Sequence, residues 1–165
     1  MKFLLLTLLT AVLPCIPEPT LGEIRNCYQA ASIQKAAAEK LNQLTLNIDS
    51  SAAPVMIAYK GANEMVQAKY AFNPMTKLSR FNKGKALLQM AVSLDSLSLE
   101  TRFLRFSIQS NIPSLLNYNG EISTDKQFLM NNTSICQDRG LKDMILNYFA
   151  ATHTLTEAEL KKLKN

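Results

Sequence analysis

Apolar residues recur three or four positions apart through most of the chain after residue 23, and this spacing constrains the fold more than any other feature. It is the spacing of one face of an α-helix. No segment alternates apolar and polar residues over several positions between turn residues, as a half-buried strand does. The sequence therefore predicts an all-α protein, a small bundle in which consecutive helices pack as antiparallel neighbours.

Prolines, glycines and polar breaks divide this pattern into about six or seven helices. The predicted ranges are 23–48, 54–70, 75–94, 100–112, 124–131, 138–151 and 157–164. In the first of these ranges, Gln34 interrupts the apolar spacing. In the helix at 75–94 we expect Leu78, Phe81 and Leu88 to face inward. Gly61 lies inside a helix, where glycine costs about 1 kcal/mol relative to alanine, and we expect it to allow a close contact with another helix. Thr156 and Glu159 have the spacing of a capping box that starts the last helix.

The first 22 residues are typical of a signal peptide. Lys2 precedes an apolar run, Phe3 to Leu13, which is too short to cross a bilayer comfortably. Small residues at Thr20 and Gly22 suit a signal peptidase, so we expect cleavage after Gly22. The remaining domain, 23–165, contains no run of about 18 apolar residues that would cross a membrane. We therefore expect an exported protein, periplasmic or secreted.

The chain has three cysteines. Cys15 follows the apolar run and could be the lipid-modified residue of a bacterial lipoprotein, although Pro14 stands where a small residue is expected. Cys27 and Cys136 remain after cleavage at Gly22. An oxidising compartment permits a disulfide between them, and two buried free thiols are the alternative. Two cysteines this far apart in sequence do not decide between these possibilities.

The segment KGKALLQMAVSLDSLSLETRFL resembles the second helix and exit turn of a tetratricopeptide repeat. A small residue at Gly84, a large one at Leu88 and a small one at Ala91 follow the order of that repeat, and Leu94 and Asp95 match its turn. Ser96 stands where the repeat prefers proline, and the link AFNPMTKL is longer than in the repeat. The resemblance covers one helix and a turn, and implies one repeat-like helical hairpin inside a bundle.

A broader resemblance extends over nearly the whole chain after the signal peptide. The order from YAFNPMTKLSRF to the helix at LTEAEL is similar to a family of small exported bacterial proteins with no assigned activity. It implies the fold and an exported location. It implies no catalytic or binding residue.

Arg102, Arg105 and Gln109 share one side of the helix at 100–112, while Phe103 and Phe106 lie on another. The arginines could pair with carboxylates such as Glu100, Glu121 or Asp125. Alternatively, they could bind the carboxylate or phosphate of a small ligand, since a guanidinium suits both. The separation of the arginines from the phenylalanines argues against nucleic acid as a partner.

A second basic patch is formed by Lys77, Arg80 and Lys83. Between Lys69 and Lys85 there are five basic residues and no acidic one. This segment is either a solvated helix face or a surface for an anionic partner.

Signals for catalysis are sparse. His153 is the single histidine, and neither metal-ligand spacing nor a glycine-rich phosphate loop occurs. We expect no enzyme, no cofactor and no metal site. The sequence favours a protein- or peptide-interaction module of the cell envelope, whose partner meets a face built from the helices at 54–70, 75–94 and 100–112. A small anionic-ligand binder that uses Arg102 and Arg105 is the alternative.

Overall fold

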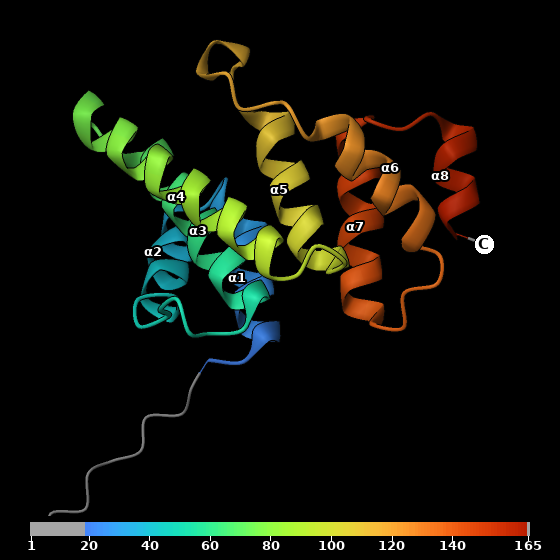
Figure 1. The fold of residues 1–165 in the computed structure, drawn as a ribbon, viewed down its shortest axis with the longest axis horizontal. Coiled ribbons are helices and arrows are strands. Elements are labelled where there is room, and N and C mark those ends of the chain that lie inside the picture. Colours follow the sequence, from blue (N-terminus) through green and yellow to red (C-terminus); the bar gives the residue numbers. More distant parts are fainter. Residues whose placement is uncertain (1–18, 165) are drawn as a thin grey trace, which may run out of the picture.

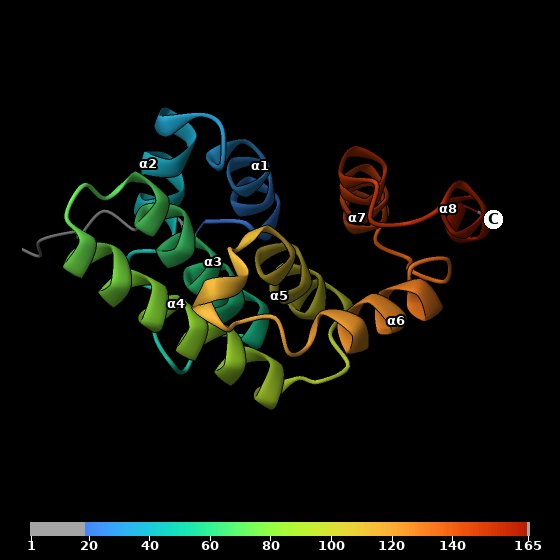
Figure 2. The same cartoon turned by 90° about the horizontal axis from the view of Figure 1, so that it is seen from above.

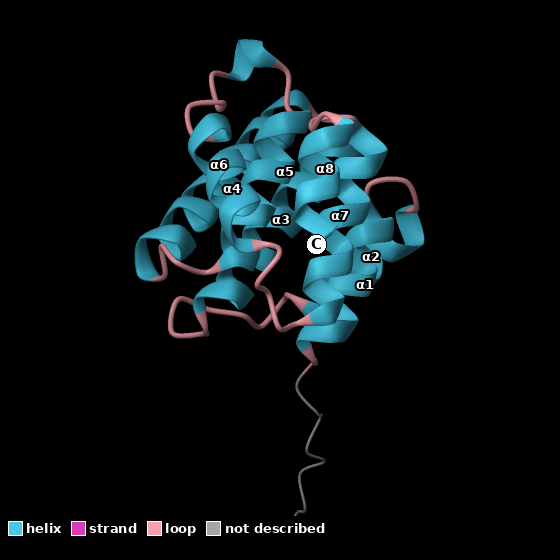
Figure 3. Ribbon diagram, turned by 90° about the vertical axis from the view of Figure 1, so that its right-hand side faces the viewer, coloured by secondary structure: helices cyan, strands magenta, loops and turns pink. Residues whose placement is uncertain are grey.

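The computed structural model describes residues 19–164, and within this range helices are joined by loops without any strand (Figure 3). The helices are α1 (Leu21–Ala31), α2 (Lys35–Leu44), α3 (Pro54–Tyr70), α4 (Pro74–Leu94), α5 (Leu99–Asn111), the 3-10 turn η1 (Ser114–Leu116), α6 (Ile122–Asn132), α7 (Arg139–Thr152) and α8 (Glu157–Lys164). The prediction of an all-α bundle is confirmed.

The described range contains eight α-helices, slightly more than the six or seven predicted. The difference arises because the helix predicted at 23–48 is two helices, α1 and α2, separated by a turn at residues 32–34. Ile33 in this turn is exposed. The reversal lets Ala31 on α1 and Leu41 on α2 enter the same core.

Several helices begin at the residues that the sequence indicates. The side chain of Asn73 accepts hydrogen bonds from the backbone N–H groups of Met75 and Thr76 at the start of α4. The capping box at α8 is present, since the backbone N–H of Glu159 donates to Thr156 and the backbone N–H of Thr156 donates to Glu159. Pro54 and Pro74 occupy first-turn positions, where a missing N–H costs nothing.

The helices are arranged as four consecutive pairs: α1 with α2, α3 with α4, α5 with α6, and α7 with α8. The first helices of the pairs also contact one another in succession, α1 with α3, α3 with α5, and α5 with α7. Figures 1 and 2 show the result, with α5 between the four N-terminal helices and the last three. Helix α5 is accordingly buried along most of its length.

Two apolar cores lie on the two sides of α5. Leu104 and Ile108 of α5 join the first core with α1 to α4, whereas Phe103 and Phe106 join the second with α6 to α8. Both apolar sides of α5 are thus used, as the positions of these residues on a helix predict.

The α3–α4 pair is held by a close backbone contact. A Cβ built on Gly84 would lie 2.8 Å from the carbonyl oxygen of Gly61. Leu88 and Ala91 of α4 are fully buried, as expected. The expectation for Leu78 is wrong, because its side chain is 48% exposed. Residues 74–79 are all exposed, so Leu78 lies in an uncovered first part of α4.

The apolar run Phe3 to Leu13 and Cys15, which carry the predicted signal peptide core and lipid anchor, lie outside the described residues. Residues 20–22 belong to the predicted signal peptide, but Leu21 and Gly22 begin α1, and Thr20 caps this helix through a capping box with Glu23. From Pro19 onward, no helix combines the length and apolar character that a membrane crossing requires.

Candidate functional site

Arg102 and Arg105 both bind Asp125 of α6. The Nε of Arg105 lies 2.7 Å from one carboxylate oxygen of Asp125 and its Nη2 lies 2.8 Å from the other, while Nη1 of Arg102 lies 3.0 Å from the second oxygen. Arg105 is 3% exposed and Asp125 is fully buried. The structure therefore favours the structural interpretation, in which these arginines connect α5 to α6 through buried ion pairs.

The carboxylate of Glu121 adds a further negative charge to this network, 3.8 Å from Arg105. Burial alone would lower the pKa of the Arg105 guanidinium, but the hydrogen bonds to Asp125 and the nearby carboxylates raise it. Two arginines thus meet two carboxylates, and no positive charge is left over for a ligand.

Gln109, the third predicted site residue on this side of α5, is also buried. Its side-chain oxygen and the hydroxyl of Tyr118 are buried, and residues 19–164 offer neither of them a hydrogen bond. Burial raises the pKa of Tyr118, whose ring lies 5.2 Å from the Nζ of Lys85. These contacts anchor the loop after α5 to the first core.

A second ionic network involves residues that the sequence alone did not connect. Glu100 accepts hydrogen bonds from Nε and Nη2 of Arg25, at 2.6 and 2.7 Å, and from the hydroxyl of Tyr59 at 2.6 Å. Arg25 also binds Asp138 at 2.7 Å. Burial and the neighbouring Glu100 raise the pKa of Tyr59, so the hydroxyl stays a donor. The network ties α1, α3 and α5 to the start of α7.

The third ionic network contains the predicted patch on α4. Glu64 of α3 is buried and binds both Arg80, at 2.9 Å, and Lys83, at 2.6 Å. Lys77, the third predicted residue of the patch, is exposed. One carboxylate therefore faces two cations, so this network keeps a net positive charge that the other two lack.

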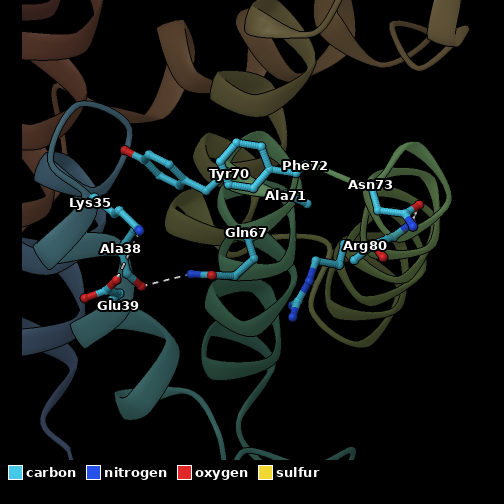
Figure 4. Close-up of a pocket in the computed structure, with 10 residues that line it drawn as sticks. Lys35, Ala38, Glu39, Gln67, Tyr70, Ala71, Phe72, Asn73 and Arg80 are labelled. Carbon is cyan, nitrogen blue, oxygen red and sulfur yellow. Dashed lines mark hydrogen bonds and ion pairs between the residues drawn. The ribbon is translucent and has the colours of Figure 1, made fainter.

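An open groove lies beside this network, between α2 and α4 and across the end of α3 (Figure 4). Its volume is about 350 Å³, at the lower end of the range for ligand sites. Its lining residues are Lys35, Ala38, Glu39, Gln67, Tyr70, Ala71, Phe72, Asn73, Thr76 and Arg80.

Hydrogen bonds fix the side chain of Gln67, which forms the floor of the groove. The amide nitrogen of Gln67 donates to the carbonyl oxygen of Ala38 at 2.9 Å and to the side chain of Asn63 at 3.1 Å. Asn63 in turn donates to Asn42 of α2 at 3.0 Å. Figure 4 shows Gln67 reaching from α3 towards α2. The groove therefore has a defined polar floor before any ligand binds.

Large apolar side chains are exposed next to the groove. Phe72, in the turn between α3 and α4, is fully exposed, Met75 is 73% exposed, and Leu78 follows on the same helix. The α1–α2 turn lies at the same end, because Lys69 donates to the carbonyl oxygen of Ser32 and Tyr70 donates to that of Ala31. This turn adds the exposed Ile33.

We call this surface the hairpin end. It comprises the groove residues together with Ile33, Lys69, Met75, Lys77, Leu78 and Lys83. The sequence pattern singled out its basic residues on α4 but missed Phe72, Tyr70 and Lys35. Phe72 could have been found from the sequence, because it comes directly before Asn73-Pro74, where α4 starts. A side chain in such a turn has few neighbours and is therefore expected to be exposed.

The other candidate residues do not gather at a site. Cys27 and Cys136 are free thiols in the structure, so the disulfide is not formed here. Cys27 lies in the first core and Cys136 packs against the second. His153 is exposed and ends α7 with a positive φ of 50°.

Comparisons of the chain with protein-family models, with curated proteins and with solved structures gave no match.

Proposed function

We propose that this protein is a non-catalytic interaction module of the cell envelope that binds a segment of another protein at the hairpin end. The proposal rests on one observation: exposed apolar side chains and surplus positive charge occur together on this surface. Phe72, Met75 and Leu78 stand uncovered beside the groove. Exposed apolar groups rimmed by polar ones are typical of protein interaction sites.

The arrangement of helices supports a binding role. Helix pairs that stack in succession leave their turns and outer helices available to partners, and the first helices of the four pairs contact one another in series. The contact between Gly61 and Gly84 and the burial of Leu88 and Ala91 hold α3 and α4 together as a tightly packed hairpin, whose turn lies at the proposed binding surface. The proposed location in the envelope rests on the signal peptide features of residues 1–22.

The surface differs in part from the face expected at first. The three helices at 54–70, 75–94 and 100–112 correspond to α3, α4 and α5, but α5 is buried between the two cores. The accessible surface at this end of α3 and α4 is completed by α2 and the α1–α2 turn instead. Arg102 and Arg105 take no part in the proposed binding, because Asp125 holds them.

Site-specific photocrosslinking in the native envelope tests this proposal. A photoreactive amino acid is placed at Phe72 and, as a matched control, at Leu115, which is 83% exposed in the loop after α5. We expect a discrete adduct from position 72 that position 115 does not give, and we expect Lys77→Glu to weaken it. Equal adducts at both positions, or none at position 72, would contradict the proposal.

A further inference from the structure

The three ionic networks of the protein differ in their charge balance, and this difference identifies the chemistry that the hairpin end is ready to bind. Arg102 and Arg105 are balanced by Asp125 and Glu121, and Arg25 is outnumbered by Glu100 and Asp138. Only the network of Arg80, Lys83 and Glu64 has more cations than carboxylates among the described residues.

The surroundings of that network increase the excess. The basic residues at the hairpin end are Lys35, Lys69, Lys77, Arg80 and Lys83. Its one acidic residue is Glu39, and the buried Glu64 lies against Arg80 and Lys83. Glu39 lies 3.8 Å from Lys35 on the same helix, so this carboxylate is already opposed. An exposed pair of this kind contributes little to stability and can exchange partners at small cost.

The position of Arg80 suits a second anion. Its Nη1 binds the buried Glu64, and the side chain, 38% exposed, also lines the groove. A guanidinium has five N–H donors arranged in a fork. Arg80 can therefore keep its bond to Glu64 while its remaining donors meet a carboxylate that enters the groove between α2 and α4.

The size of the groove and the apolar groups beside it specify the rest of the ligand. A volume of about 350 Å³ admits one or two side chains rather than a folded domain. The rings of Tyr70 and Phe72 lie at the end of the groove above Gln67 (Figure 4). An apolar side chain next to the entering carboxylate would cover part of Phe72, which is fully exposed in the free protein.

We propose that the groove between α2 and α4 binds an acidic peptide segment of the partner, with a carboxylate between Lys35 and Arg80 and an adjacent apolar side chain against Phe72. This inference rests on the proposed function, because it names the part of the partner that meets the hairpin end. The polar floor at Gln67, which Asn63 and Asn42 hold in place from behind, favours a peptide over a lipid surface, since a flat bilayer would touch the protruding residues and leave the groove empty.

The test uses the exported chain and synthetic peptides. A short fluorescent peptide that alternates glutamate with phenylalanine is compared with a peptide in which glutamine replaces every glutamate, by fluorescence anisotropy. We expect the acidic peptide to bind at least about fivefold more tightly at low ionic strength, and this preference to shrink as added salt screens the charges. Equal affinity of the two peptides would overturn the inference.

Matched charge reversals locate the binding. Lys35→Glu and Lys161→Glu change the net charge by the same amount, but Lys161 is an exposed residue of α8, at the other end of the molecule. We expect Lys35→Glu to lower the affinity for the acidic peptide at least about fivefold and Lys161→Glu to lower it much less. Phe72→Ser serves as a second variant that changes no charge, and it should also weaken binding. Equal effects of the two lysine variants would show a response to net charge alone and overturn the inference.

The remaining outcomes separate this inference from the proposed function. Vesicles that contain anionic lipid are offered in parallel with the peptides. Binding to vesicles that depends on Phe72, without binding of the acidic peptide, would overturn the inference in favour of a lipid surface. A discrete photocrosslink at position 72 without any preference for the acidic peptide would overturn the inference while the proposed function stands.

Discussion

Gly61 and Gly84 face each other across the α3–α4 hairpin, so closely that a Cβ on Gly84 would lie 2.8 Å from the carbonyl oxygen of Gly61. Real Cβ atoms do not approach a backbone oxygen to this distance, so the helices would have to separate to admit a methyl group. Glycine inside a helix costs about 1 kcal/mol. The close contact explains why glycine is nevertheless suited to both positions.

The first prediction is that Gly84→Ala lowers the free energy of unfolding although it raises the helix propensity of α4. We expect the overpacking cost of about 1–3 kcal/mol to exceed the gain in propensity. Gly120→Ala is the control, because no atom lies within 4 Å of a Cβ built there. Denaturant melts that show Gly84→Ala to be as stable as the control variant would contradict the close packing.

A second prediction concerns the residues that pack next to this contact. Leu88→Ala should leave a cavity that costs about 2–5 kcal/mol, and Ala91→Leu should overpack a fully buried position at a cost of about 1–3 kcal/mol. Both native side chains are 0% exposed. Leu115→Ala removes the same atoms from an exposed leucine and should change the melt little. Equal stability of Leu88→Ala and Leu115→Ala would show that α4 is not packed as described.

The third prediction separates the structural from the ligand-binding interpretation of Arg105. Arg105→Ala leaves the carboxylate of Asp125 buried without its main partner, which typically costs about 3–5 kcal/mol. Arg105→Lys keeps the charge, loses the planar fork and should be less destabilising. Thermal melts with and without phosphate, at matched ionic strength, provide the measurement. A neutral or stabilised Arg105→Ala, or a rise in melting temperature with phosphate that this variant loses, would favour an anion site instead.

The fourth prediction is a loss of stability in alkali. Burial raises the pKa of Tyr28 to about 12, whereas tyrosine in an unfolded chain titrates near about 10. The native state therefore holds a proton that the unfolded state has released, so this contribution to stability is present below pH about 10 and falls as pH rises towards about 12. The slope is about 1.4 kcal/mol per pH unit for each such tyrosine.

Two variants isolate this effect in denaturant melts across the alkaline range. Tyr28→Phe removes the titrating group, so its stability should fall less steeply with pH than that of the native protein. Ser107→Ala removes the hydroxyl that lies 2.9 Å from Tyr28 but keeps the tyrosine, so the steep fall should remain. Parallel pH curves for Tyr28→Phe and the native protein would contradict the assignment.

The fifth prediction concerns the proposed cleavage after Gly22. Cleavage after Gly22 would remove Thr20, whose side chain accepts the backbone N–H of Glu23, and the partly buried Leu21. We therefore expect a chain that begins at Glu23 to fold, with a lower denaturation midpoint than one that begins at Pro19. N-terminal sequencing of the protein recovered from cells establishes which chain exists, and a lipid-modified Cys15 would contradict cleavage after Gly22.

The positions of most helices could be predicted because their signals are local. Asn73-Pro74 starts α4, and Thr156 with Glu159 starts α8. The division between α1 and α2 was harder to predict, because Ser32, Ile33 and Gln34 include neither proline nor glycine. What breaks the helix is packing, since the reversal places Ala31 and Leu41 in one core.

The candidate site was harder to predict from the sequence than the positions of the helices. The sequence identified basic residues on two helices, but their partners are tertiary neighbours: Asp125 lies 20 residues after Arg105, and Glu64 lies 16 residues before Arg80. These contacts decide which basic residues are neutralised. They neutralise the arginines of α5 and leave a surplus of positive charge on α4. The exposure of Leu78 could not be predicted either, because helical spacing does not show which turns of a helix its neighbours cover.

The measurement that tests the central proposal most directly is an NMR titration that follows the backbone amides of the isotope-labelled protein. The added peptide alternates glutamate with phenylalanine, as before, but carries no fluorophore. We predict shifts concentrated on Lys35, Gln67, Tyr70, Phe72 and Arg80 around the groove, with Arg102, Arg105 and Gln109 unchanged. The glutamine version of the peptide should produce much smaller shifts at the same concentration. Shifts centred on Arg102, Arg105 and Gln109, or spread evenly over the basic residues of the whole surface, would contradict binding at the hairpin end.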